Sequence, residues 1–392
     1  MTALESLPSE LQILILEEIP DLASLHSLIN ASPAYRHTYL HSSKTVLHQL
    51  VSRAYGLTDV SDAIAAVDSE GLYAENESNK AKIIALLDRR RRHAELPRSR
   101  LSSEVQSVKL LELYDKLDHV LQTYCAQPHR SNAALSPVER SRILRALCRL
   151  QTYCNIFGTR EWAESHALER RPTWHRNFTI DEMWSLFFRT MPPWEVEEFG
   201  SIWTFVRQVY SDLFTEISRE FPRSSPQWKA LRPATMPIDP SELYGSEDEE
   251  EYINDDYDDY CNHLVALGPC FLSKVLRQQN KCTQRCLLAS NSVTAKSSFM
   301  DLVNVVTAHQ PLLHPADKYE VANIANALSS FPETEQPAPG WKRHWYGPRP
   351  VDQVMSAIVS EPSSDEAGPT EDIYQRTIGY FPGWTWGYAF SE

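Results

Sequence analysis

Helix-start signals followed by apolar residues three or four positions apart recur along this chain, and they limit the folds that it can adopt. Ser136-Pro137-Val138-Glu139 and Thr179-Ile180-Asp181-Glu182 both match the capping box, in which a hydroxyl residue and a glutamate satisfy backbone N–H groups at a helix start. Glycine is scarce, with 12 residues in 392, which argues against a β-rich fold with many tight turns and against glycine-rich nucleotide loops. We therefore predict a mainly α fold.

The clearest helical pattern lies in residues 103–126 and 136–158. Their apolar residues step by three or four and predict an amphipathic pair, and the intervening residues 127–135 permit an antiparallel hairpin. The stripes consist of Val105, Val108, Leu111, Tyr114, Leu117, Leu121 and Tyr124 in the first, and of Ile143, Leu147, Leu150, Cys154 and Phe157 in the second. Other helices are predicted over 43–55 (capped by Ser43), 59–70, 79–95, 179–191, 194–217, 260–267, 269–279, 298–309 and 317–330.

The N-terminal residues 6–40 predict three further short helices. Pro8 suits a first helical position, Asp21 is a good cap after the break at Pro20, and Ser32-Pro33 is another helix start. The apolar residues at helical spacing are Leu7, Leu11, Leu14, Ile15 and Ile19 in the first helix, Leu22, Leu25, Leu28 and Ile29 in the second, and Tyr35, Tyr39 and Leu40 in the third.

The first of these helices carries more apolar residues than one packing face needs. Ile13 and Leu16 widen its stripe. A helix that is apolar nearly all round is either deeply buried or shares its surface with a partner. Because this helix lies at the end of the chain, we favour the partner.

These residues resemble an F-box, the short helical motif that docks on the Skp-type adaptor of a cullin–RING ubiquitin ligase. The resemblance rests on Leu7-Pro8-x-Glu10-Leu11, an apolar helix, and then Ile19-Pro20-Asp21-Leu22 with Leu25. Where many F-boxes have a Trp-containing segment, this chain has Ala31-Ser32-Pro33-Ala34-Tyr35, as in the F-box-like form of many uncharacterised fungal proteins. The segments 143–158 and 192–198 are similar to the helical body that follows it in those proteins.

The resemblance implies a substrate receptor or adaptor that performs no chemistry and needs no cofactor. Its N-terminal helices would dock the adaptor, and its body would hold an unidentified protein target. The residues implied at the adaptor interface are Leu7, Pro8, Glu10, Leu11, Leu14, Ile15, Ile19, Leu22, Leu25 and Leu28. The alternative is a stand-alone helical scaffold whose N-terminal helices pack inward.

The expected organisation is an F-box-like domain (1–42), a helical body in two parts (43–221 and 260–330), an insert (222–259) and a tail (331–392). Between Asp239 and Asp259 the insert has eleven acidic residues and no Lys or Arg, which accounts for most of the net charge of −14. A calcium loop is not favoured, because alternate positions are not acidic and the turn glycine is missing. Ser246 precedes Glu247-Asp248-Glu249 and is a candidate site for an acidophilic kinase.

Two charged runs allow more than one interpretation. Arg89 to Arg92 at a helix C-terminus would offset the helix dipole, and the alternatives are a nuclear-import signal or a phosphate-binding patch. Glu195, Glu197 and Glu198 in a first helical turn are expected from the dipole, whereas a catalytic carboxylate pair would look similar. The dipole is the favoured interpretation of both runs, and no nucleic-acid motif accompanies the arginines.

A zinc set is weakly suggested by Cys282 and Cys286 together with His309 and His314. The connection between the pairs is longer than a zinc finger allows, and Pro311 interrupts the histidines, so we expect no metal.

The alternating aromatic residues of the tail predict an extended segment with one aromatic face. It would either dock on the helical body or form the wall of a peptide-binding groove, and docking is favoured. These residues are Trp384, Trp386, Tyr388 and Phe390.

The remaining composition favours an intracellular location. Seven cysteines, scattered singly, fit reduced thiols. No run of about 18 apolar residues supports a membrane span. The N-terminus has Glu5 and Glu10 and no basic start, unlike a secretory signal.

Overall fold

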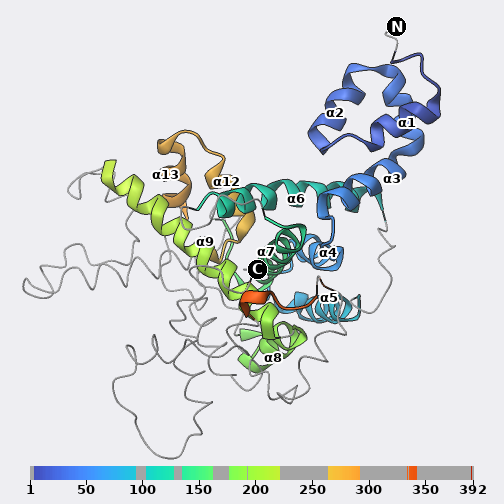
Figure 1. Cartoon of the computed structure of the whole chain (residues 1–392). Helices are drawn as coiled ribbons and strands as arrows, with labels where there is room; N and C mark the ends of the chain where they lie inside the picture. Colours follow the sequence, from blue (N-terminus) through green and yellow to red (C-terminus); the bar gives the residue numbers. More distant parts are fainter. Residues whose placement is uncertain are drawn as a thin grey trace, which may run out of the picture.

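The computed structural model describes residues 4–93, 103–127, 135–161, 176–191, 193–220, 264–291, 333, 335–341 and 390. Within these ranges the chain is mainly helical and has no strand (Figure 1), which confirms the predicted mainly α class. The α-helices are α1 (Ser9–Glu17), α2 (Leu22–Ala31), α3 (Pro33–Tyr55), α4 (Val60–Asp68), α5 (Lys80–His93), α6 (Glu104–Cys125), α7 (Pro137–Phe157), α8 (Ile180–Leu186), α9 (Pro193–Glu220), α12 (Pro269–Leu276) and α13 (Lys281–Ser290), and two 3-10 turns are η1 (Glu77–Asn79) and η3 (Phe188–Thr190).

Hydrogen bonds at the first residues of α7, α8 and α2 confirm the predicted starts of these helices. The Ser136 hydroxyl accepts from the Glu139 N–H at 3.1 Å while Glu139 accepts from the Ser136 N–H at 2.9 Å. Thr179 and Glu182 form the same reciprocal pair. Asp21 caps α2 by accepting from Ser24 N–H at 2.7 Å. These bonds satisfy backbone donors that a helix start otherwise leaves free.

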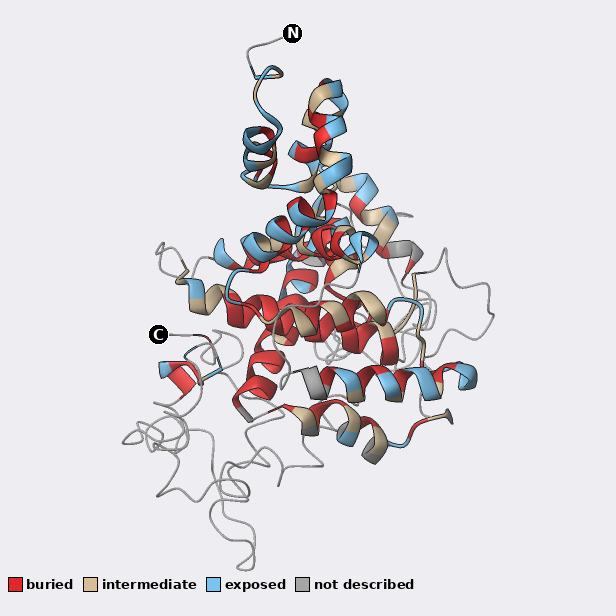
Figure 2. Cartoon of the chain, turned by 90° about the vertical axis from the view of Figure 1, so that its right-hand side faces the viewer, coloured by how far each residue is buried: buried red, intermediate tan, exposed pale blue. Residues whose placement is uncertain are grey.

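The three N-terminal helices lie at one end of the molecule. Both α1 and α2 pack against α3, and Figure 1 shows α3 running from them toward the body. Leu16, Ile19, Leu25 and Tyr35 are buried in the core. In Figure 2 the helices nearest the N-terminus are largely exposed or intermediate, whereas the middle of the body is buried.

Helix α3 corrects the prediction of separate third and fourth helices. It is continuous from Pro33 to Tyr55, so the expected boundary at residues 42/43 falls inside a helix. Ser43 is not a cap there, because its hydroxyl donates to Glu104 Oε1 at 2.7 Å. Residues 40–46 contain neither glycine nor proline, and once a helix is nucleated each further residue adds a hydrogen bond at little cost.

Helix α7 is the centre of the body. Helices α4, α6, α9 and α12 pack against it. Its predicted stripe is buried, but Arg142, Arg145 and Arg149 are buried as well, so the prediction of an amphipathic α7 was wrong. A helix covered on every side has no solvent face, and its polar residues must find partners inside. Helix α6 is amphipathic as predicted, except that Val105 is exposed.

The segment after α8 also departs from prediction. Helix α8 ends at Leu186 and is followed by the 3-10 turn η3, whereas one helix up to Pro192 was predicted. The aromatic residues there pack around Tyr153 of α7, with ring centroids 5.2 Å from Phe187 and 5.6 Å from Phe188. Turning both rings toward one buried residue accounts for the break in the regular helix.

Part of the C-terminal tail lies on the body. The Trp341 ring packs edge-on against Trp194 at 5.7 Å, and the Trp194 indole N–H donates to Glu335 O at 3.1 Å. Phe390 is buried against Tyr124 at 6.0 Å. These contacts favour docking of the tail over a free aromatic wall. The predictions for 222–259 with Ser246, for helices 298–309 and 317–330, and for Trp384, Trp386 and Tyr388 lie outside the described residues.

We expect Gly158→Ala to destabilise the protein by about 3 kcal/mol, the upper part of the range for overpacking. A Cβ at Gly158 would lie 2.2 Å from Ala266 O and 2.4 Å from Cys154 O, both backbone atoms. The close approach arises because Thr159 N–H donates to Ala266 O at 3.1 Å. Urea unfolding followed by circular dichroism measures the change.

Gly71→Ala is the control for this substitution. Gly71 has φ +79°, and a methyl group added there would meet no heavy atom within 4 Å, so only the left-handed backbone is penalised, by roughly 1–2 kcal/mol. A smaller loss for Gly158→Ala than for Gly71→Ala would contradict the steric argument.

Candidate functional site

Four exposed leucines lie in the N-terminal helices and in the segment just before them, and we call them together the leucine face. Its members are large apolar side chains left uncovered within the part of the chain that the structure describes: Leu4 (59% exposed), Leu11 (45%), Leu14 (55%) and Leu40 (66%). Leu11 and Leu14 were predicted at a partner interface, whereas Leu4 was missed and Leu40 was predicted only as part of the third helix. Leu11 and Leu14 lie three positions apart on α1, so they share one side of that helix, and neighbouring exposed apolar side chains of this kind mark interaction surfaces more often than isolated ones do.

The other predicted interface residues divide into three groups. Pro8 and Glu10 are exposed beside the leucine face. Ile19 and Leu25 are buried in the core, so their prediction as contact residues is corrected to a structural role. The half-buried residues are Leu7, Ile15, Leu22 and Leu28.

The side of α1 that faces inward is the side of Gln12, not that of Leu11 and Leu14. Gln12 and Leu16 point inward, and Leu11 and Leu14 are left outside. Gln12 is buried because its amide is fully used: Nε2 donates to Leu7 O at 3.1 Å and Glu5 O at 3.2 Å, and Oε1 accepts from the Thr38 hydroxyl at 2.5 Å. A polar residue inside the helix thus sets its rotation.

Further contacts hold the N-terminal segment on α2 and α3. The Ser32 hydroxyl donates to Glu5 Oε1 at 2.7 Å. At the other end of α1, Arg53 donates to Ile19 O at 2.8 Å and Glu17 O at 2.7 Å, which satisfies carbonyls that a helix C-terminus leaves free. The leucine face is therefore presented on a fixed backbone.

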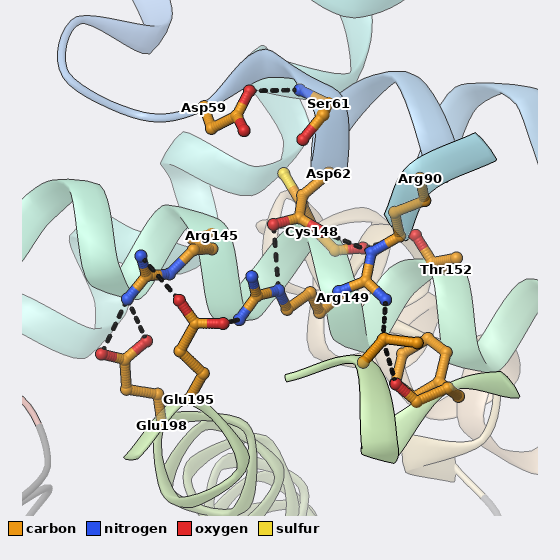
Figure 3. A network of polar contacts seen from close by, with 12 residues as sticks. Asp59, Ser61, Asp62, Arg90, Arg145, Cys148, Arg149, Thr152, Glu195 and Glu198 are labelled. Atoms are coloured by element: carbon orange, nitrogen blue, oxygen red, sulfur yellow. Dashed lines mark hydrogen bonds and ion pairs between the residues drawn. The ribbon is translucent and has the colours of Figure 1, made fainter. Parts of the chain in front are cut away.

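A second polar feature is a chain of buried ion pairs in the body (Figure 3). Arg149 Nε lies 2.9 Å from Asp62 Oδ2, and its Nη1 lies 2.7 Å from Glu195 Oε2. Arg145 extends the chain to Glu195 at 3.1 Å and Glu198 at 2.7 Å. The charges alternate along the sequence of contacts Arg90, Asp62, Arg149, Glu195, Arg145 and Glu198.

This buried ion-pair chain joins α4, α5, α7 and α9. At its α5 end, Arg90 Nε lies 2.6 Å from Asp62 Oδ1, and the Arg90 guanidinium stacks over Phe187. Arg90 is therefore a core residue paired with Asp62, so the helix dipole, which was the favoured interpretation of the arginine run, does not by itself account for this position. Arg89 pairs with Asp68 at 2.9 Å near the surface.

The buried ion-pair chain also corrects the interpretation of the glutamates that begin α9. The dipole alone was expected to account for Glu195 and Glu198, but both are buried and paired with arginines. Since these carboxylates are engaged by guanidinium groups, the described geometry gives no support to a catalytic pair. Arg142, Arg145 and Arg149 follow one helical stripe, which by itself indicates a solvated face, so no local signal marked these arginines as buried.

The place of each carboxyl group in the buried ion-pair chain sets the direction in which its pKa is shifted. Burial alone would raise the pKa of Asp62, but Arg149 and Arg90 outweigh it and hold that pKa below its ordinary value. Burial raises the pKa of Glu198, which lies at the end of the ion-pair chain beside Arg145. Asp62 is therefore the anion on which the pairs depend most.

The thiols and metal-ligand candidates that the structure describes are either buried or not grouped with further ligands. Burial raises the pKa of the Cys148 thiol well above its ordinary value, which keeps it protonated and weakly nucleophilic. Cys282 and Cys286 are exposed on α13, while His309 and His314 lie outside the described residues. Among the residues that are described, no three His, Cys, Asp or Glu side chains are grouped to hold a metal ion.

Searches for related proteins and membrane segments add little. No described helix combines the length and apolar character needed to cross a bilayer. No protein-family model matches the chain, and no curated protein or solved structure is detectably similar to it. The class that the fold defines is a mainly helical protein with an exposed leucine face.

Proposed function

We propose that this chain is an F-box-like interaction protein that binds the Skp-type adaptor of a cullin ubiquitin ligase through its leucine face. The observation that carries the proposal is the exposure of Leu11 and Leu14 on a helix whose opposite side is fixed to α3. Leu7 and Pro8, which open the motif, lie next to them in sequence and are not buried.

A fixed backbone favours such a contact energetically. Association is opposed by the ordering of loops and side chains, and a preorganised surface reduces that cost. Hydrogen bonds from Gln12, Ser32 and Arg53 already order the N-terminal segment and both ends of α1. The leucines can then contribute the hydrophobic free energy of their burial with little further ordering.

The body would hold the protein target. Its contribution would be to raise the local concentration of that target near the ligase, without a chemical step on this chain. The ion pairs that join α4, α5, α7 and α9 would serve this role by giving the body one defined arrangement.

We expect the double substitution Leu11→Glu/Leu14→Glu to weaken adaptor binding by about 100-fold or more. Each leucine buried in an interface contributes roughly 1.5–3 kcal/mol, which corresponds to about 10- to 100-fold in Kd. Isothermal titration of the full chain with purified Skp-type adaptor measures the change. Circular dichroism should show an unchanged fold, because both side chains are exposed.

Leu57→Glu is the matched control. Leu57 is 42% exposed, similar to Leu11, and it follows α3 outside the leucine face. It should leave adaptor binding unchanged. The proposal fails if the intact chain shows no binding at adaptor concentrations of tens of micromolar. It also fails if Leu11→Glu/Leu14→Glu binds the adaptor as well as Leu57→Glu does. The chain is then better described as a stand-alone helical scaffold.

A further inference from the structure

We propose that His37 and His41 form a binding site for a divalent transition-metal ion, with Cu²⁺ preferred. The two histidines lie one turn apart on α3, and both are exposed. Side chains at this spacing lie on the same side of a helix. The site shares no residue with the leucine face, so its test is independent of the proposed adaptor binding.

The hydrogen bond of His41 identifies the nitrogen available to a metal. His41 Nδ1 lies 2.9 Å from His37 O. A carbonyl oxygen only accepts, so Nδ1 carries the proton, and in the neutral ring Nε2 keeps its lone pair. Metal-binding histidines commonly donate their second ring N–H to a backbone carbonyl in this way, which fixes the ring and strengthens the ligand.

The separation of the rings fits two neighbouring ligands of one ion. A metal–nitrogen bond is about 2.0–2.1 Å and the ring centroid lies about 1.1 Å further out, so two imidazoles at a right angle have centroids about 4.5 Å apart. The observed centroid separation is 4.5 Å, with the ring planes tilted by 41°. Binding would require the exposed His37 ring to turn so that one of its nitrogens meets the ion held by His41 Nε2.

The preference for Cu²⁺ rests on its intrinsic affinity for imidazole, and the ring separation is compatible with it. A tetrahedral angle, which Zn²⁺ prefers, would place the centroids about 5.2 Å apart, whereas the right angle belongs to the square-planar or tetragonal sites of Cu²⁺ and Ni²⁺. Cu²⁺ also has the highest intrinsic affinity for nitrogen ligands among the divalent first-row ions. With two protein ligands, the remaining positions would be filled by water.

The test is a titration of the full chain with Cu²⁺ in the presence of glycine as a weak competing chelator. With the exposed thiols blocked by alkylation, because free thiols reduce Cu²⁺ to Cu⁺, we expect one site of highest affinity, with an electron paramagnetic resonance spectrum that shows two coordinated imidazole nitrogens. His37→Ala and His41→Ala should each weaken binding at this site about tenfold or more, because the second ligand of a chelate acts at high effective concentration. Lower pH should weaken binding as protons compete for the imidazoles.

His48→Ala is the control, since His48 is another exposed histidine of α3. It should bind Cu²⁺ as the intact chain does. The proposal is overturned if His37→Ala and His41→Ala retain the affinity and spectrum of the intact chain, or if the intact chain shows a single coordinated imidazole. All three substitutions are at exposed positions, and circular dichroism can verify that the fold is unchanged.

Discussion

Asp62→Asn is expected to lower the free energy of unfolding by about 3–5 kcal/mol, the range found when one partner of a buried ion pair is removed. Asp62 separates two buried arginines, Arg90 at 2.6 Å and Arg149 at 2.9 Å. Without its charge, both guanidinium groups stay in the interior and are undercompensated. Because most domains have only 5–15 kcal/mol of stability, the change should be obvious in urea unfolding followed by circular dichroism.

The matched control is Asp68→Asn, on the same helix. Asp68 pairs with Arg89 at 2.9 Å, but the side chains are 29% and 54% exposed, and such surface pairs contribute about 0–1 kcal/mol. Glu198→Gln should cost less than Asp62→Asn, because burial raises the pKa of Glu198 and already disfavours its charged form. Equal losses for Asp62→Asn and Asp68→Asn would contradict the role assigned to the buried ion pairs.

The contribution of Asp62 should also depend on pH with a definite sign. Its folded-state pKa lies below the ordinary value, so its stabilising effect is complete above that value and is lost as the pH falls through the lower, folded-state pKa. The difference in stability between the intact chain and Asp62→Asn should therefore be constant near neutrality and shrink below about pH 4. A difference that grows on acidification would show that the sign is wrong.

Tyr153→Ala should destabilise the protein by about 3–5 kcal/mol, as large aromatic truncations in a core do. The Tyr153 ring packs against four phenylalanines, with centroids 5.2–5.8 Å away, that come from the end of α7 and from the segment through α8 to α9. Removing it leaves a cavity where these elements meet. Thermal unfolding followed by circular dichroism measures the loss.

Two companion variants test whether the aromatic ring is responsible. Tyr153→Phe keeps the ring and should keep most of the stability. Tyr39→Ala removes a half-buried tyrosine from α3 and should cost clearly less than Tyr153→Ala. Comparable losses at the two tyrosines would mean that the aromatic packing around Tyr153 has no special weight.

Sequence reasoning was reliable for where helices begin. Ser136, Thr179 and Asp21 act as caps as predicted, because a cap is a local interaction between residues at most three positions apart. It was less reliable for where helices continue or stop. The early end of α8 accompanies aromatic contacts with Tyr153, which lies far away in the sequence. The continuity of α3 is local, since residues 40–46 contain neither glycine nor proline, but the helix-start signal at Ser43 hid it.

The candidate site was predicted only in part, because the rotation of α1 could not be read from leucine spacing. Leu11 and Leu14 were predicted together with Ile19 and Leu25 at one interface, yet the first two are exposed and the last two are buried, while Gln12 and Leu16 also face inward. The rotation is set by the bond of Gln12 to Thr38, a residue 26 positions away. The buried ion-pair chain was missed for the same reason, since its cations and anions lie on four helices.

The sequence by itself determined the helical class, the cap positions and most of the apolar positions of the body, because these follow from local bonds and from the helical period. Only the tertiary structure decided which side of each helix faces inward. Whether a residue is buried depends on the groups that the other helices place opposite it. Arg90, Arg145 and Arg149 are buried because carboxylates on neighbouring helices pair with them. Leu11 and Leu14 are exposed because α1 turns Gln12 toward Thr38 of α3.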